Sequence, residues 1–178
     1  MIKHLILSSF VCVSTAALSI DSQHIKNVIF PGKQTSDLSD LNPDFRELSL
    51  KTIEELEKDG YQVNIRATYR DSEYQDFLYN VSQVTERFLS RSVTRSSGGN
   101  SRHNRQYNDQ PGSCAVDVEA TGLTMDQEAE FYKILIEVSR KNGLRTGGRY
   151  RKKATSVWSN YGLGWDPGHV YMTWGSCR

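Results

Sequence analysis

The sequence predicts a single α+β domain, because segments with helical periodicity alternate with short runs typical of strands. The first helix is expected between Leu41 and Gly60, since Asn42 is a preferred N-cap and Pro43 suits the first helical position. The run from Tyr61 to Thr68 then alternates between apolar and polar side chains, as a half-buried strand does. With 178 residues, the chain is long enough for one domain with a sizeable core, but not for two.

The second half of the chain continues this alternation. A helix is expected over residues 72–88, and another over residues 124–142, where Thr124 can cap the helix and Gln127 follows three positions later. Short strands are expected at residues 114–118 and within the strand-like run 165–174. Residues 90–113 are rich in Ser, Arg, Gly and Asn. Because they lead directly into a strand, we interpret them as a functional loop of the domain and not as a linker.

The amino terminus resembles a secretory signal peptide. A short basic start precedes a largely apolar stretch of nine residues, Leu5–Val13, and small residues follow. The apolar stretch is shorter than the roughly 20 residues that span a bilayer, so we expect no stable membrane anchor. We predict a signal peptide over residues 1–19, a polar lead-in over residues 20–40 and the folded domain over residues 41–178. The protein is then expected to be secreted or periplasmic.

Composition and charge exclude several classes of protein. The chain has 22 Lys and Arg against 21 Asp and Glu, so nothing in its charge favours a nucleic-acid partner. A mean hydropathy of −0.58 excludes a polytopic membrane protein, and 37% hydrophobic residues argue against a disordered chain. We expect a monomer.

Three polar side chains stand out as metal ligands. Two imidazoles, His103 and His169, and one carboxylate, Asp117, match the ligand set of catalytic zinc sites, which keep a fourth position open. A lone histidine is more often a structural residue. An aspartate within a strand, by contrast, costs free energy unless something satisfies it. Asp117 shares a face of its strand with Ala115, which leaves room beside the metal, whereas Cys114 points to the other face.

The pattern of these residues resembles the zinc peptidases of bacterial cell walls. This family includes the VanY-like D-alanyl-D-alanine carboxypeptidases and the L-alanyl-D-glutamate endopeptidases of phage endolysins. The similarity covers residues 41–174 and rests on five motifs in order: Tyr69-Arg70 with Gln75, Ser101-Arg102-His103, Ala115-Val116-Asp117-Val118, Gly143 to Gly148, and Asp166-Pro167-Gly168-His169.

The resemblance implies a small antiparallel sheet with helices packed on it, and a function for each matching residue. It implies zinc as the cofactor and peptidoglycan stem peptides as the substrate. It assigns His103, Asp117 and His169 as the zinc ligands and Asp166 as the acidic catalytic residue. It also implies that Arg70 is a catalytic cation near the scissile carbonyl and that Ser101 and Tyr69 bind substrate.

One spacing departs from the family pattern. Asp117 follows His103 by 14 residues, about twice the usual separation. An insertion within Asn104–Ser113 accounts for this. Asp109 is an alternative ligand, but it lies in an Asn-Asp-Gln-Pro turn, and no alanine stands two residues before it as in the family pattern. We therefore prefer Asp117.

The remaining questions are the bond that is cut and the state of the cysteines. Aspartate at position 166 and the Gly-Gly turn favour an endopeptidase over a D-alanyl-D-alanine carboxypeptidase. A non-catalytic zinc-containing module, like the amino-terminal domain of Hedgehog proteins, is the other alternative, although it would not be expected to retain an acid at this position. Cys114 and Cys177 remain after signal removal and are expected to form a disulfide, with free thiols or an intermolecular bridge as alternatives.

Overall fold

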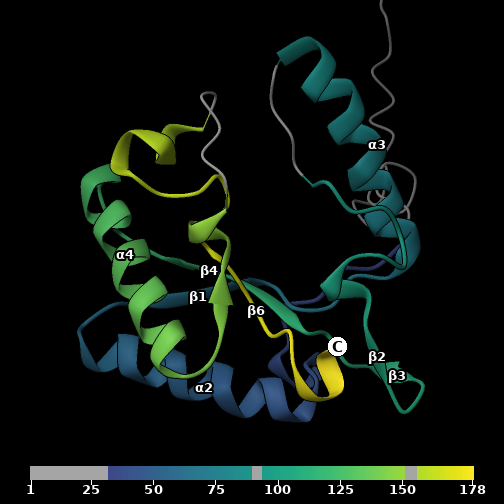
Figure 1. The fold of residues 1–178 in the computed structure, drawn as a ribbon, viewed down its shortest axis with the longest axis horizontal. Helices are drawn as coiled ribbons and strands as arrows, with labels where there is room; N and C mark the ends of the chain where they lie inside the picture. Colours follow the sequence, from purple (N-terminus) through teal and green to yellow (C-terminus); the bar gives the residue numbers. More distant parts are fainter. Residues whose placement is uncertain (1–31, 90–93, 151–155) are drawn as a thin grey trace, which may run out of the picture.

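The computed structural model describes residues 32–89, 94–150 and 156–178. The predicted signal peptide and residues 20–31 of the predicted lead-in lie outside the described residues. Within them, an antiparallel sheet with strand order β1-β4-β6-β5 is flanked by helices (Figure 1). Its elements are β1 (Val63–Ala67), β4 (Ala115–Ala120), β5 (Arg145–Thr146) and β6 (His169–Tyr171), with helices α2 (Pro43–Lys58), α3 (Ser72–Leu89) and α4 (Met125–Lys141). The fold is thus α+β, as predicted.

The helix boundaries follow the caps that the sequence offers. The Asn42 side chain accepts a hydrogen bond from the backbone N–H of Asp44 at the start of α2. Thr124 and Gln127 form a reciprocal capping box at the start of α4. Gly60 and Gly143 follow the ends of these helices at φ values of +91° and +77°, a region that favours glycine. The predicted positions of both helices are confirmed.

The hydrophobic core lies between one face of the sheet and helices α2 and α4. Val116, Val118 and Val170 project from the sheet into the same buried cluster as Phe45 of α2 and Phe131 of α4. Helix α3 stands away from α2 and α4 in Figure 1. None of the helices in the described part of the chain is both long and apolar enough to cross a bilayer.

The opposite face of the sheet carries the polar residues of the site. Because side chains alternate along a strand, burial of Val116 and Val118 places Asp117 on the other face of β4. Strand β4 pairs with β6 in an antiparallel register that sets Asp117 opposite His169 and Ala115 opposite Tyr171. Strand β1 flanks β4 on its other side, with Ala67 opposite Asp117.

The loop expected to be functional contains short elements of its own. A single 3-10 turn, η2 (Arg102–Asn104), precedes a hairpin of β2 (Gln106–Tyr107) and β3 (Gln110–Pro111). Its tip residues, Asn108 and Asp109, both have positive φ, as a two-residue hairpin turn of this hand requires. The hairpin projects beside the sheet in Figure 1. It occupies the position where the sequence indicated an insertion.

The final segment is less regular than the sequence pattern predicted. Only three residues of the run 165–174 form a strand, because Asp166–Gly168 make a turn and the chain leaves the sheet after Tyr171. The last turn, η5 (Gly175–Cys177), folds back to the start of α2, where Ser176 donates a hydrogen bond to Asn42. Cys177 and Cys114 form a disulfide with their Cα atoms 5.7 Å apart.

Candidate metal centre

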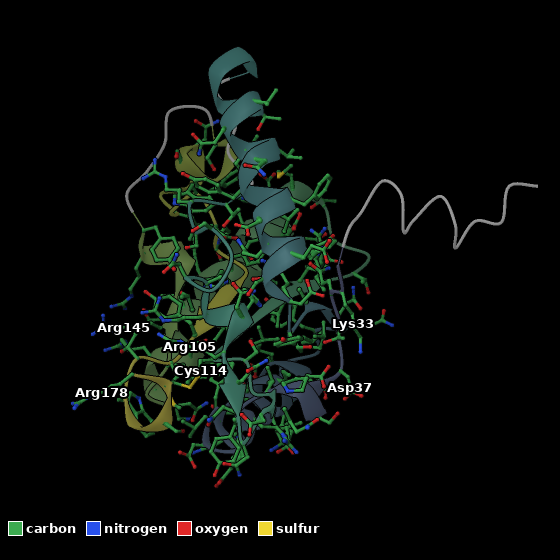
Figure 2. The ribbon with its side chains drawn as sticks, turned by 90° about the vertical axis from the view of Figure 1, so that its right-hand side faces the viewer. Lys33, Asp37, Arg105, Cys114, Arg145 and Arg178 are labelled. Atoms are coloured by element: carbon green, nitrogen blue, oxygen red, sulfur yellow. A yellow bond between two sulfur atoms is a disulfide. The ribbon has the colours of Figure 1, made fainter. Side chains whose placement is uncertain are left out.

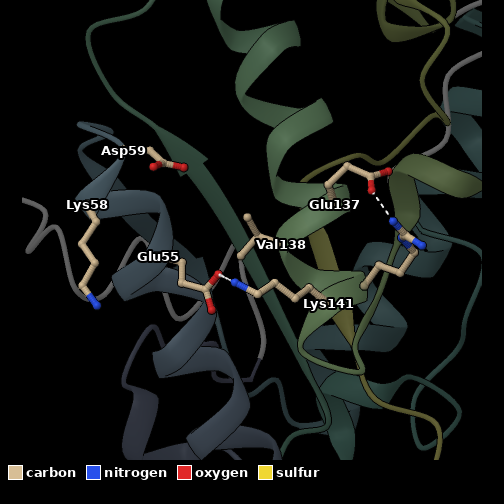
Figure 3. A pocket seen from close by; sticks show the side chains of 7 residues that line it. Glu55, Lys58, Asp59, Glu137, Val138 and Lys141 are labelled. Carbon is tan, nitrogen blue, oxygen red and sulfur yellow. Dashed lines mark hydrogen bonds and ion pairs between the residues drawn. The ribbon is translucent and has the colours of Figure 1, made fainter.

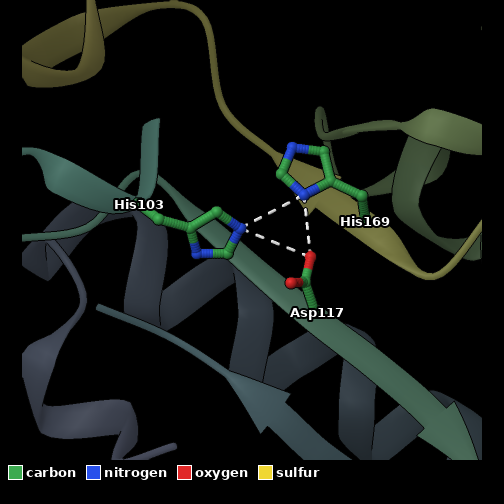
Figure 4. A group of neighbouring side chains, drawn as sticks. All are labelled: His103, Asp117 and His169. Carbon is green, nitrogen blue, oxygen red and sulfur yellow. Dashed lines mark hydrogen bonds and ion pairs between the residues drawn. The ribbon is translucent and has the colours of Figure 1, made fainter. Parts of the chain in front are cut away.

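Three side chains from separate parts of the chain meet on the face of the sheet that lies opposite the hydrophobic core. We call this the open face of the sheet. His103 comes from η2, Asp117 from β4 and His169 from β6 (Figure 4). The His169 Nδ1 atom lies 2.8 Å from Asp117 Oδ1, and the His103 Nε2 atom lies 3.3 Å from each of these two atoms. One donor atom from each residue therefore falls within 4.8 Å of the others, close enough for all three to bind a single metal ion.

The surroundings of His103 leave one ring nitrogen ready to act as a ligand. Its Nδ1 atom lies 2.6 Å from the backbone carbonyl oxygen of Thr68. A carbonyl oxygen only accepts hydrogen bonds, so Nδ1 carries the proton and Nε2 presents a lone pair toward Asp117. A hydrogen bond of this kind behind a ligand is usual for metal-binding histidines. The donor set therefore fits zinc, which takes two imidazoles and a carboxylate in catalytic sites.

Hydrogen bonds fix η2 to the connection between β1 and α3. The backbone N–H of Arg70 donates to the carbonyl of His103 at 3.0 Å. The Asn104 side chain donates to the carbonyls of Arg70 and Asp71, at 2.6 and 3.1 Å. Ser101, predicted to bind substrate, caps η2 and accepts the N–H of His103 at 3.3 Å. These contacts hold a buried imidazole in place although η2 is only one turn long.

Arg70 contacts the aspartate directly. Its Nη2 atom lies 2.5 Å from Asp117 Oδ2, the oxygen that does not face His169. Its Nε atom donates to the side chain of Gln34 at 2.8 Å. Residues 34 and 35 run alongside the end of β1, where Thr35 exchanges backbone hydrogen bonds with Thr68 and Tyr69. A segment before the first helix thus positions the guanidinium.

Asp166 lies at the turn that precedes β6. Its backbone carbonyl accepts the N–H of His169 at 3.3 Å, and Gly147 packs so closely against this carbonyl that a Cβ there would collide with it. Burial raises the pKa of the Asp166 carboxyl to about 6, and the charge of Asp117 also raises it, while that of His169 lowers it. The carboxyl therefore lies within electrostatic range of two of the three candidate ligands.

Opposing effects set the protonation of the three candidate ligands. Burial alone would raise the pKa of Asp117, but the imidazoles of His103 and His169 hold it well below its usual range. Burial lowers the pKa of His103. Burial would also lower the pKa of His169, but its hydrogen bond to Asp117 and the charges of Asp117 and Asp166 raise it. His103 and Asp117 therefore hold the protonation states that zinc binding requires.

The structure also places the other residues singled out in the sequence. Asp109 lies exposed at the tip of the hairpin and is not part of the group that could hold a metal, so the choice of Asp117 is the one the geometry supports. Tyr69 is half-buried two residues after the end of β1. Gln75 is buried in α3 and donates to Thr94 and Ser96, at 3.0 and 2.7 Å, which ties α3 to the segment that leads into η2.

Several residues of the site were missed in the sequence. Gln34, Thr68 and Asn104 support Arg70 and His103 through hydrogen bonds, and Tyr171 stacks on His169 with ring centroids 5.4 Å apart. Only Asn104 had a signal, as the fourth residue of a capping box that begins at Ser101. The others act through contacts between segments that no local pattern reveals.

A groove elsewhere on the molecule has a different character. It measures about 590 Å³ and lies between the carboxyl-terminal halves of α2 and α4, away from the open face of the sheet (Figure 3). Charged side chains dominate its walls, and the 2.7 Å ion pair between Lys141 and Glu55 crosses it. Because its charges neutralise one another, we do not assign it a ligand.

No family model and no curated protein matches the sequence. Solved structures do share the fold. The vancomycin-resistance D,D-pentapeptidase VanY, solved in complex with Zn(II), superposes with a TM-score of 0.53 over 80% of this chain and 79% of its own, at 17% identity. The LD-carboxypeptidase LdcB, whose structure concerns peptidoglycan recognition, superposes with a TM-score of 0.50 over 74% of this chain, at 17% identity. The match spans 58% of the LdcB chain.

Proposed function

We propose that this protein is a zinc-dependent peptidase that cleaves the stem peptides of peptidoglycan. The observation that carries the proposal is the meeting of His103, Asp117 and His169 donor atoms within 4.8 Å on the open face of the sheet. The same fold in VanY, a D,D-pentapeptidase solved with Zn(II), supports both the metal and the substrate class. These residues would hold the ion. When bound, zinc supplies a Lewis acid and an activated water near neutral pH.

The chain's own residues supply the proton transfer and a second cation. We assign Asp166 as the general base that accepts a proton from the attacking water and delivers it to the leaving amine. A carboxyl group whose pKa is near 6 suits both steps, because it exchanges protons readily near neutral pH. Arg70 would stabilise the negative charge that develops on the carbonyl oxygen. A guanidinium has five N–H donors, and its bonds to Gln34 and Asp117 use two of them.

For the bond that is cut, we propose L-alanyl-D-glutamate, with the D-alanyl-D-alanine bond as the alternative. The aspartate at position 166 supports this choice, because the endolysin-type enzymes that the sequence resembles have Asp there and many carboxypeptidases have Glu. Ser101 and Tyr69 remain proposed substrate contacts. Ser101 would contact the substrate in addition to capping η2, because its hydroxyl already accepts the N–H of His103.

The proposed place of action is outside the cytoplasm. The disulfide between Cys114 and Cys177 supports export, because disulfides persist in oxidising compartments. We propose that the chain is exported through the segment over residues 1–19 and acts as a monomer. Amino-terminal sequencing of secreted protein should begin between Ala17 and Ile20. An intact Met1 on secreted protein would contradict cleavage.

Digestion of purified peptidoglycan tests the function. The zinc-loaded protein should release fragments whose masses identify the bond: peptides that begin with D-glutamate if the L-alanyl-D-glutamate bond is cut, with L-alanine left on the glycan, or free D-alanine if the alternative holds. A chelator such as EDTA should abolish the release, and added zinc should restore it. A protein that binds zinc but releases no fragment would instead be a binding module.

A further inference from the structure

A wall of aromatic rings adjoins the candidate metal centre. The ring of Tyr171 stacks on His169, and Tyr150 lies 5.9 Å from Tyr171 and 6.3 Å from His169 between ring centroids. Trp165 extends the wall by stacking on Tyr150 at 5.8 Å. Burial raises the pKa of the Tyr150 hydroxyl, and its interaction with Tyr171 raises that pKa further. The rings are therefore held in one arrangement beside the metal ligands.

An arginine without an ion-pair partner lies on this wall. The Cζ atom of Arg102 lies 4.8 Å from the centroid of the Tyr171 ring. Its Nε atom is buried and has no hydrogen-bond partner among the described residues, and no carboxylate of residues 32–89, 94–150 or 156–178 forms an ion pair with it. A guanidinium stacked on a ring is held in place, and it keeps its N–H donors for a planar anion.

A second arginine approaches the same tyrosine from the neighbouring strand. Arg145 of β5 is the register partner of Tyr171, so the two side chains emerge on the same face of the sheet as Asp117 and His169. It is exposed, and no acidic side chain in the described part of the chain pairs with it. In Figure 2, Arg145 lies on the same side of the ribbon as Arg105 and Arg178, away from Asp37.

We propose that Arg102 and Arg145 form a carboxylate-binding subsite over Tyr171, beside the candidate metal centre. One guanidinium over the Tyr171 ring and a second on the adjacent strand would together match the planar, bidentate hydrogen bonding of a carboxylate. A partly buried cation without a counterion is costly, and an anionic ligand removes that cost. The Tyr171 ring stacks on the candidate ligand His169. A carboxylate bound over Tyr171 would therefore lie beside the metal centre, where the peptide bond is proposed to be cut. The inference rests on the proposed function and adds a substrate requirement to it.

The carboxylate has two sources in a stem peptide: the carboxyl terminus and the free α-carboxylate of D-glutamate. Three probes separate them: the pentapeptide L-Ala-γ-D-Glu-L-Lys-D-Ala-D-Ala, the same peptide with a carboxamide terminus, and the same peptide with D-isoglutamine. The pentapeptide contains both of the bonds that the protein is proposed to cut. Cleavage by the zinc-loaded protein gives kcat/KM for each probe. Equilibrium binding to the metal-free protein is measured in parallel, because hydrolysis does not interfere there.

The native protein should prefer the free acid to one of the two amides by about 10-fold to 100-fold, the effect of one charge-assisted hydrogen bond. Arg102→Gln and Arg145→Gln should each reduce that preference to within about 3-fold, mainly by weakening binding of the free acid. Arg140→Gln is the matched control. It removes an exposed arginine from α4 on the other side of the sheet and should keep the native preference. The amide probe that the native protein binds and cleaves less well shows which of the two carboxylates occupies the subsite.

Two results separate this inference from the proposed function. Cleavage without any preference for a carboxylate, or an equal effect of Arg102→Gln on all three probes, would overturn the subsite and leave the peptidase. A binding preference that Arg102→Gln and Arg145→Gln abolish, in a protein that cleaves none of the probes, would support the subsite and overturn the peptidase. Arg145→Gln keeps the test decisive if Arg102→Gln perturbs the fold, because Arg145 is exposed.

Discussion

Asp117 and His169 are directly opposite each other in the antiparallel pair of β4 and β6, and their Oδ1 and Nδ1 atoms lie 2.8 Å apart. The register of two neighbouring strands thus sets the distance between two candidate ligands. A slip of one residue would move either side chain to the face that packs on α2 and α4. The third candidate ligand, His103, depends instead on a loop and its hydrogen bonds.

The ligand set predicts which substitutions remove the metal. Asp117→Ala and His169→Ala should each lose most of the zinc, because two remaining protein ligands bind it far more weakly than three. Asp109→Ala is the control, since Asp109 is an exposed aspartate at the hairpin tip. Elemental analysis of dialysed protein measures zinc per chain. Loss of zinc from Asp109→Ala with retention in Asp117→Ala would show that the wrong aspartate was chosen.

The hydrogen bonds that hold η2 in place predict that Asn104, which is not a candidate ligand, affects zinc binding. Asn104→Ala removes two hydrogen bonds to the carbonyls of Arg70 and Asp71 and should weaken zinc binding by about 10-fold, as removal of groups behind a metal ligand does. Asn100→Ala, which removes only an exposed contact with Ser97, is the matched control. A competition titration with a chelator compares the two. Equal affinities for both variants would mean that Asn104 does not hold His103 in place.

Protons should compete with zinc at His169 first. The pKa of this imidazole is raised above the ordinary 6.5, so at lower pH zinc must displace a proton, whereas Asp117 stays ionised because its pKa is lowered. The apparent affinity should therefore fall by about 10-fold per pH unit below the pKa of His169, and more steeply below the lowered pKa of His103. An affinity that stays constant from about pH 8 to about pH 5.5 would be inconsistent with this assignment.

The disulfide should contribute to stability. Cys114 precedes β4, and Cys177 is near the carboxyl terminus, so the bridge closes a loop with a sequence separation of 63. The double variant Cys114→Ala/Cys177→Ala should lower the free energy of unfolding by roughly 2–4 kcal/mol, measured by urea denaturation. Peptide mapping without reductant should recover the two cysteine peptides linked. Free alkylation of both thiols in undenatured secreted protein would disprove the bridge.

Local signals were enough to predict most of the elements and, together with the family resemblance, to select the three candidate ligands. The caps at Asn42 and Thr124 located two helices, and the unusual aspartate at position 117 located the site within a strand. Tertiary contacts account for what was not predicted. The hydrogen bond from Arg70 to Gln34 joins residues 36 positions apart, and the one that fixes His103 uses a backbone carbonyl, which carries no sequence signal. The strand-like run 165–174 was overestimated because Pro167 and Gly168 form a turn.

The most direct test of the account is the rate of stem-peptide cleavage by zinc-loaded Asp166→Asn. The substitution keeps nearly the same size and leaves the three candidate ligands unchanged, but it removes the proton acceptor. Zinc content should equal that of the native protein, while the rate should fall by roughly 10²-fold to 10⁴-fold, the usual contribution of a positioned general base. A near-native rate with zinc bound would contradict the assigned mechanism.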